Sequence, residues 1–382
     1  ILMGLSAIQM SLFILVGNAV IGFKGMNFEF FLMLFSVSVS SNILGLIISS
    51  TFNSIGTIYI MIPLIMIPQM VLGGAMFTFD KLNKLITSVD KVPLLAEVIP
   101  ARYAYEGIIV HQYKHNSYQS KFFECEMGVS MADYKGTYYL PKLEEALDRC
   151  KAKSDKLSLD SLKKIDSYLM DLALVQNELG KEVMRNPEID FPHLHKLVAD
   201  SFNISTYNYA QEYISQLKSV YSEKYQVSND KRDAIIGYIE SDPQRKERFN
   251  ELKDEYFNET LNDIVRKTLD KNKILRDGNK LIQVLDPIYQ MPEPEGILSF
   301  RTHFLAPVKY FAGTYWDTLW FNIVAIWVIT AFLYAILYYD VTRRIADYFG
   351  SVAFKKQLDK VKSLFAKIKM PKMPSFKKNK VE

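Results

Sequence analysis

The chain has 382 residues, a formal net charge of +4 and 23% charged residues. Its charges are unevenly placed: residues 1–79 contain only Lys24 and Glu29, residues 318–339 contain none, and residues 115–300 are dense in Lys, Glu and Asp. This segregation excludes a single water-soluble domain and predicts an all-α polytopic membrane protein that carries a large soluble insertion.

The first residues form an apolar run without the charged start and small-residue cleavage site of a signal peptide. We therefore interpret the chain as the C-terminal portion of a longer protein, with a further segment upstream of Ile1.

Four windows are long and apolar enough to cross a bilayer, which takes roughly 20 residues of helix. They cover about 2–23, 28–50, 57–79 and 318–340. Any one of them could be a core helix of a soluble protein, but three in close succession argue against that. The sequence predicts three transmembrane helices within 1–79 and a fourth, with its outer approach, within 301–341.

Positive charge indicates the orientation. Arg343 and Arg344 follow the fourth window, and ten lysines lie in the last thirty residues. Because cytoplasmic loops are enriched in Lys and Arg, we expect residues 342–382 to be a cytoplasmic tail and residues 80–317 to lie outside. Apolar residues recur in the tail at steps of three and four, which predicts a basic amphipathic helix on anionic lipid; a solvated, partly disordered tail is the alternative.

Two of the windows carry residues that a plain anchor does not need. Ser41, Gly45 and Ser49 recur at intervals of four in the second window, which permits close helix packing within the chain or between subunits. The third window contains Pro63, Pro68, Gln69, Gly73 and Gly74. Polar or interrupted backbone at membrane depth is tolerated where it packs on protein or lines a cavity, so this window is a candidate pathway.

Residues 80–115 are expected to lie on the outer side as re-entrant or interfacial helices. The run at 92–113 is apolar but contains Glu97, Arg102, Glu106 and a central Pro100. These residues favour a short helix pair over a fifth span, which the spacing alone leaves open.

Residues 116–300 predict a soluble α-helical insertion. Apolar residues alternate in steps of three and four between Leu162 and Val183, and again between Ala210 and Tyr221, as in amphipathic helices. Prolines between residues 287 and 294 predict a linker back to the membrane. The chain's two cysteines, Cys125 and Cys150, are a candidate disulfide, with free thiols as the alternative.

Several segments resemble the membrane domain of G-subfamily ABC transporters, the type-2 permeases of the pleiotropic-drug-resistance and white kind. They are the second and third windows, the run Leu72–Phe77 (LGGAMF), the segment Pro100–Glu106 (PARYAYE) and the run His303–Asn322. The long outer loop is similar to that of bacterial, Bacteroidetes-like members. The four windows would then be the third to sixth helices of that domain, and Pro100, Arg102, Tyr103 and Glu106 would belong to its re-entrant segment.

The resemblance implies a membrane-spanning part of an ATP-driven transporter, an exporter that forms its pathway with a second copy or a homologous half-transporter. Ungapped alignment places Ile67 and Met70, on either side of Gln69, at substrate-facing positions. Ala75 and Met76 fall where the family often has two bulky apolar residues that close the outer exit. Ala75 departs from that pattern, so Met76 or Phe77 is expected to close it alone; plain helix packing is the alternative for all of these residues.

The sequence contains no catalytic motif. It lacks the phosphate-binding G-x-x-x-x-G-K-[ST] loop, so ATP and Mg²⁺ are expected on an upstream domain, and no cofactor on this chain. His193 and His195 are two residues apart and would point to different faces of a helix, so no metal site is expected. Because the basic tail directly follows a membrane helix, a lipid surface is expected and no nucleic-acid partner. A membrane-anchored scaffold that presents the periplasmic insertion to a partner without transport is the alternative function, and a membrane enzyme is a third.

Overall fold

The computed structural model describes the whole chain except residues 22–24, 53, 78, 80–89 and 351–382. It is 71% helical, and three of its described helices are long and apolar enough to cross a bilayer. The expected fold class, an all-α polytopic membrane protein, is confirmed. The expected helix in the tail falls mostly on residues outside the described ones.

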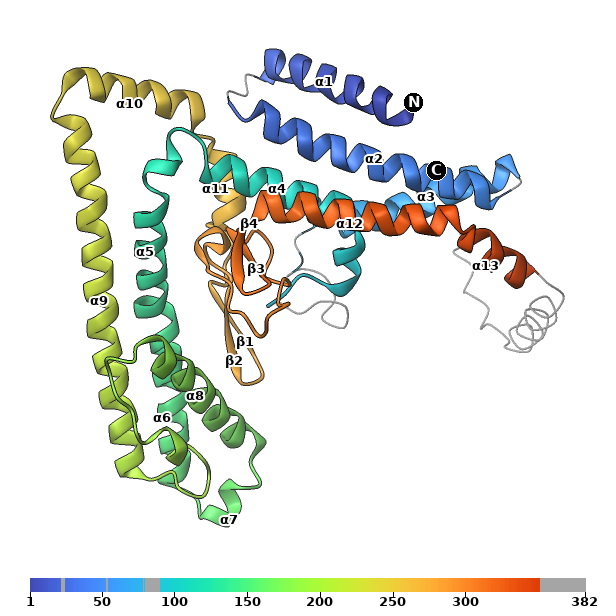
Figure 1. Cartoon of the computed structure of the whole chain (residues 1–382). Coiled ribbons are helices and arrows are strands. Elements are labelled where there is room, and N and C mark those ends of the chain that lie inside the picture. The colour runs from blue at the N-terminus through green and yellow to red at the C-terminus, as the bar shows by residue number, and fades with distance from the viewer. Residues whose placement is uncertain (22–24, 53, 78, 80–89, 351–382) are drawn as a thin grey trace, which may run out of the picture.

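The three long apolar helices are α1 (Leu2–Ile21), α2 (Asn27–Thr51) and α12 (Thr318–Tyr338), which lie side by side in Figure 1. Helices α2 and α12 run in the same direction, because Trp327 Nε1 donates to Ser36 Oγ over 3.1 Å and the hydroxyls of Thr51 and Thr342 lie 2.6 Å apart. Helix α1 is antiparallel to α2, and Ser6 Oγ accepts hydrogen bonds from α2 at 2.7 and 3.0 Å. Thr342 lies in the first turn of a short helix, α13 (Val341–Gly350).

The fourth apolar helix is shorter than predicted. The window at 57–79 becomes α3 (Ile55–Val71), 17 residues or about 25 Å of helix. Gly74 has φ +82°, the left-handed conformation that ends helices, and a Cβ there would lie 2.5 Å from the ring of Phe304. The predicted boundary at residue 79 is wrong because the helix must end at this glycine pair.

Residues 94–114 form two short helices joined at a bend. A 3₁₀ turn, η2 (Leu94–Val98), precedes α4 (Pro100–Lys114), and Ile99 between them is extended. Proline is well suited to the first helical position, because a backbone N–H there would have no acceptor within the helix and proline has no N–H. Tyr103 at the start of α4 packs beside Ile326 of α12, whereas Lys114 at its end reaches Asp317, just before α12. Helix α4 therefore runs antiparallel to α12.

The insertion is a helical domain built on two long rods (Figure 1). One rod is continuous: η3 (Gln119–Lys121), α5 (Phe123–Asp133), the π-helical η4 (Tyr134–Tyr139) and α6 (Leu140–Ser154). The other is α9 (Ile204–Glu240). Between them lie α7 (Leu159–Leu162), α8 (Asp166–Arg185) and η5 (Leu194–Lys196); α10 (Pro243–Tyr256) and α11 (Glu259–Arg266) follow. The predicted stripe of α9, from Ala210 to Tyr221, is buried in the core against α6 and α8.

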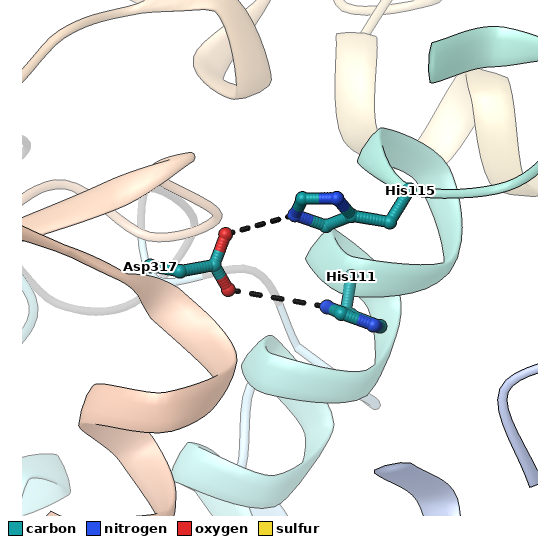
Figure 2. Close-up of side chains that lie close together, drawn as sticks. All are labelled: His111, His115 and Asp317. Atoms are coloured by element: carbon teal, nitrogen blue, oxygen red, sulfur yellow. Dashed lines mark hydrogen bonds and ion pairs between the residues drawn. The ribbon is translucent and has the colours of Figure 1, made fainter.

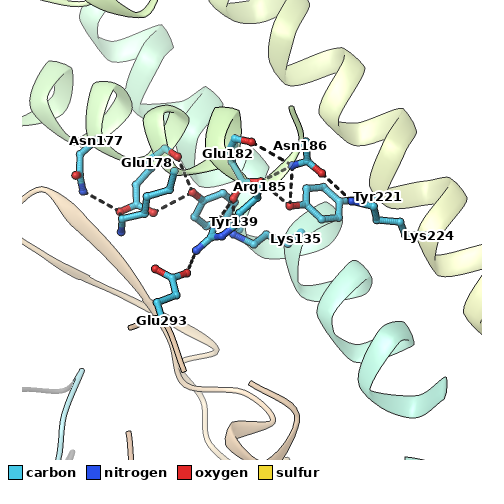
Figure 3. A network of polar contacts seen from close by, with 11 residues as sticks. Lys135, Tyr139, Asn177, Glu178, Glu182, Arg185, Asn186, Tyr221, Lys224 and Glu293 are labelled. Atoms are coloured by element: carbon cyan, nitrogen blue, oxygen red, sulfur yellow. Dashed lines mark hydrogen bonds and ion pairs between the residues drawn. The ribbon is translucent and has the colours of Figure 1, made fainter. Parts of the chain in front are cut away.

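A buried polar network ties the π-helical segment to α8 and α9 (Figure 3). Lys135 Nζ donates to Glu182 Oε1 over 2.7 Å, and Tyr221 from α9 donates to the other oxygen of Glu182. Tyr139 donates to Glu178 over 2.9 Å. Burial lowers the pKa of Lys135 to about 8, with Glu182 opposing that shift. Each charge in this network has a partner, as a buried charge requires.

Two short antiparallel hairpins, which the sequence analysis did not predict, connect the insertion to the last span. Strands β1 (Ile274–Asp277) and β2 (Lys280–Gln283) pair with Ile274 opposite Gln283. After the turn η6 (Pro287–Tyr289), β3 (Val308–Phe311) and β4 (Thr314–Asp317) pair with Val308 opposite Asp317. Asp317 then caps α12 by accepting from the backbone of Leu319 over 3.1 Å.

The two cysteines are free and buried in different places, so the expected disulfide is wrong. Cys125 packs with Phe122 and Ile239, whereas Cys150 lies in the main core of the insertion. Both belong to the same continuous rod, and 25 residues of helix separate their Cα atoms by roughly 35 Å. A disulfide needs Cα atoms less than about 7 Å apart.

We therefore predict that mass spectrometry of protein denatured and alkylated without reductant finds both cysteines labelled. In the folded protein Cys150 should resist alkylation, because burial raises the pKa of its thiol to about 12 and the thiolate is the reactive form. A Cys125–Cys150 peptide pair in the unreduced sample would contradict the structure.

Candidate functional site

The predicted re-entrant segment contains several buried charged side chains. Arg102 is 1% exposed, donates from Nη1 to Glu106 over 2.8 Å and is also paired with Glu97. Tyr103 donates to the same carboxylate of Glu97 over 2.7 Å. Arg102 and Glu106 meet because residues four apart share one face of a helix. Of the residues predicted for this segment, the structure thus brings Arg102, Tyr103 and Glu106 together, and Pro100 starts their helix.

Glu106 joins α4 to two later parts of the chain. Its side chain is fully buried, and Lys309 from β3 donates to Oε1 over 2.7 Å. The backbone N–H of Leu305 donates to Oε1 over 3.1 Å, and Asn322 of α12 donates to Oε2 over 3.3 Å. Asn322 also donates to the carbonyl of Tyr103 over 2.9 Å. One carboxylate therefore fixes the re-entrant helix to the hairpin and to the last span.

The surroundings of this network are apolar. On η2, Leu94, Leu95 and Val98 are 59–68% exposed although Glu97 beside them is buried. Such a surface fits lipid better than water. Glu97 and Glu106 are paired with Arg102 and Lys309, and Arg301 Nε also lies 4.0 Å from Glu97 Oε1. The geometry of the network supports a structural clamp and not acid–base chemistry, since each carboxylate is paired with a cation.

A second cluster lies farther along α4, at its C-terminal end (Figure 2). Asp317 receives hydrogen bonds of 2.9 Å from Lys114 Nζ and from His115 Nε2, and His111 Nδ1 lies 3.9 Å away. Burial alone would raise the pKa of Asp317, but His111, His115 and Lys114 outweigh it and hold that pKa well below its usual range. The sequence analysis missed this cluster because Asp317 is 202 residues from His115.

The predicted pathway residues lie on a helix with few contacts. Helix α3 has no buried residue among its described side chains, and Ile67 and Met70 are 59% and 51% exposed. Gln69 between them is half-buried. These residues are not part of the charge network on α4. Their apolar faces are available to lipid or to a partner.

The predicted gate residues lie after the end of α3. Ala75 is exposed, and Met76 and Phe77 are 61% and 48% exposed. The segment is anchored by Phe79, which is buried with Val92 and Ala96 next to η2.

Phe304 holds the end of α3 against the re-entrant segment. Its ring meets Phe79 edge-on with centroids 4.9 Å apart and stacks on Tyr105 of α4 at 6.2 Å. The same ring covers Gly74. The sequence does not indicate this role of Phe304, because only the fold brings residues 74, 79, 105 and 304 together.

The buried charge network yields a stability prediction. Glu106→Gln keeps the size of the side chain but leaves Lys309 and Arg102 without their full counter-charge. Breaking one partner of a buried pair costs about 3–5 kcal/mol, so we expect a clearly lower thermal unfolding midpoint in detergent. Glu145→Gln is the matched control, because Glu145 is 53% exposed in its pairs with Lys142 and Arg149. Exposed pairs contribute at most about 1 kcal/mol. Equal midpoints for the two variants would contradict the clamp.

Comparison with known proteins adds one finding. Residues 2–113 match the family model described as ABC-2 type transporter. The match covers α1, α2, α3 and the re-entrant helix α4 up to Tyr113. No curated protein and no solved structure matches the chain. Residues 2–113 are therefore similar to the membrane domain of ABC-2 type transporters, and this similarity supports a permease component of an ABC transporter.

Proposed function

We propose that this chain forms the translocation pathway of an ATP-driven exporter and works as a dimer. The observation that carries the proposal is the match of residues 2–113 to the ABC-2 family, which covers the apolar helices and the re-entrant helix together. Permeases of this family normally work with a partner permease and with ATPase subunits. The direction, outward, rests on the resemblance to the G subfamily.

Exposed surfaces on two helices support a second permease subunit. Helix α3 buries none of its described side chains within the chain. On α2, Ser41, Gly45 and Ser49 are all exposed, and a Cβ at Gly45 would meet nothing within 4 Å. Small residues let helices approach closely in lipid, where packing drives association. A second copy of the chain, or a homologous half-transporter, would cover both surfaces.

ATP hydrolysis would be supplied by a domain upstream on the same polypeptide, with ATP and Mg²⁺ bound there. The 382 residues contain no phosphate-binding loop. Closure of that domain around ATP would shift the permease between inward- and outward-facing states. ATP can shift this equilibrium only if it binds one of the two states more tightly than the other. The two states must therefore differ in their contacts.

In the dimer, Ile67, Gln69 and Met70 would line the pathway, and Met76 and Phe77 would close its outer end. Methionine suits a wall that accepts varied shapes, because it is unbranched and polarizable. The proposed gate follows the end of α3 at Val71, and the contacts of Phe304 with Phe79 and Tyr105 support a link between this segment and α4. Movement of that helix would therefore reach the gate.

We place the chain in a bacterial inner membrane, with residues 80–317 periplasmic. Two contacts support this topology. A Cβ at Gly25, in the α1–α2 connection, would lie 4.0 Å from Tyr256 of the insertion, so both belong to one side. Thr51 and Thr342 meet at the other ends of α2 and α12. The tail would bind anionic lipid, and the insertion could receive a periplasmic partner.

The topology is tested by labelling in intact cells. Ser219→Cys lies on an exposed part of α9 and should react with a membrane-impermeant maleimide, whereas Lys372→Cys in the tail should react only after lysis. The unaltered chain is the background control, because its two cysteines are buried. Labelling of Lys372→Cys but not Ser219→Cys in intact cells would reverse the placement.

The pathway is tested by single substitutions on α3. Untargeted mass spectrometry of the culture medium first identifies compounds whose release requires the full-length protein. Met70→Trp and Met76→Trp should abolish their release by filling the pathway, while expression and dimer assembly on native gels persist.

Val324→Trp is the control, because Val324 is 56% exposed on α12, outside the proposed pathway. It should leave release unchanged. Normal release by both methionine variants, or loss of assembly before release, would make α3 a structural helix. If the release of no compound requires the protein, the scaffold function is favoured instead.

A further inference from the structure

We propose that His111, His115 and Asp317 form a divalent-cation site, best suited to Zn²⁺, at the outer end of the last transmembrane helix. Binding of the ion does not depend on transport, and only its access from the outer side rests on the proposed topology. The two histidines are four residues apart on α4 and so lie on one face of that helix. Asp317 comes from the junction of β4 and α12, on the opposite side of the site (Figure 2).

The donor atoms converge. His111 Nδ1, His115 Nε2 and the Asp317 carboxylate lie within 4.8 Å of one another, and the imidazole ring centroids are 4.6 Å apart. Two atoms that bind one Zn²⁺ at about 2.0–2.2 Å each lie roughly 3.4 Å apart in a tetrahedron. Side-chain rotations that move the donor atoms by about 1 Å would therefore close the cluster around an ion.

The burial of the cluster also fits a ligand. His111 is 8% exposed and its Nδ1 has no hydrogen-bond partner, although it points toward Asp317. Buried polar atoms normally have a partner, so this one needs an explanation. The His115 side chain is 42% exposed, which gives an ion access from the outer solution.

The donor set selects the class of ion. Two imidazoles and one carboxylate with a fourth position left for water resemble the open sites that bind Zn²⁺, and Cu²⁺ and Ni²⁺ also accept imidazole. Ca²⁺ and Mg²⁺ prefer all-oxygen sites. A bound ion would connect α4 to the start of α12, on the outer side of the Glu106 clamp.

The ammonium group of Lys114 would compete with a bound ion for the Asp317 carboxylate. Its Nζ donates to Asp317 Oδ2 over 2.9 Å and also reaches the carbonyl of Pro307 at 3.4 Å. A cation entering the cluster must displace this ammonium group from the carboxylate. The site should thus bind zinc reversibly, and its affinity should rise when the lysine charge is removed.

The test uses the full chain, purified without a histidine tag, stripped with EDTA and titrated with ZnCl₂ by calorimetry. We expect one Zn²⁺ per chain and a higher thermal unfolding midpoint with zinc, because a ligand of the folded state stabilises it. His115→Ala should weaken binding at least about tenfold, since one of three ligands is lost. This variant is chosen because His115 is the most exposed ligand and its loss leaves the packing intact.

Lys114→Gln should tighten binding by about tenfold, because it removes a positive charge next to the ion. A purely structural hydrogen-bond cluster would show no such gain. The control is the double variant His193→Asn and His195→Asn, which changes two histidines on the insertion and should leave binding unchanged. The proposal fails if the unaltered chain binds no Zn²⁺, if His115→Ala binds as tightly, or if the control loses binding equally.

Discussion

The arrangement of the membrane part depends on the carboxylate of Glu106. It is fully buried and accepts hydrogen bonds from α4, from β3, from the backbone of Leu305 and from α12. A charge in such a place is tolerated only when it is paired and hydrogen-bonded on all sides. Because the donors come from residues 102 to 322, the re-entrant helix, the hairpin and the last span must adopt their positions together.

This constraint also explains how the large insertion is carried. The chain leaves the membrane part through α4 and returns through β3 and β4, and Glu106 and Lys309 join these two connections. Farther out, Asp317 joins Lys114 and His115 across the same pair of connections. A permease that alternates between two states would transmit movement of α12 to α4, and through Phe304 to the segment after α3.

Features set by composition or by local period could be predicted from the sequence. The bilayer demands long apolar segments, so α1, α2 and α12 were evident, and period 3.6 marked the buried face of α9. On α8 the same period marked Leu172 and Leu179, which are buried, but also Leu169, which is exposed. Some of the breaks between elements could also be predicted from local sequence. The Gly73–Gly74 pair follows the end of α3, and Gly278–Asn279 between alternating residues is a hairpin signal.

Long-range pairings could not be predicted. Nothing near Glu106 in the sequence indicates that Lys309 is its partner, and nothing near His115 indicates Asp317. The disulfide expectation failed for the same reason, because spacing along the chain does not show that one continuous rod keeps Cys125 and Cys150 apart. The gate and pathway assignments also depend on a partner surface, which one chain does not contain.

The central claim is that the buried charges of α4 lie at membrane depth. Nitroxide labels at Ala101 and Gln112 of α4, in protein reconstituted in lipid, test it directly through their accessibility to oxygen and to a water-soluble nickel chelate. The account predicts that Ala101 is as oxygen-accessible as a label at Val324 of α12, and that Gln112 is exposed to the aqueous reagent. If the label at Ala101 is as accessible to the aqueous reagent as the one at Gln112, α4 is part of the soluble domain and the account is wrong.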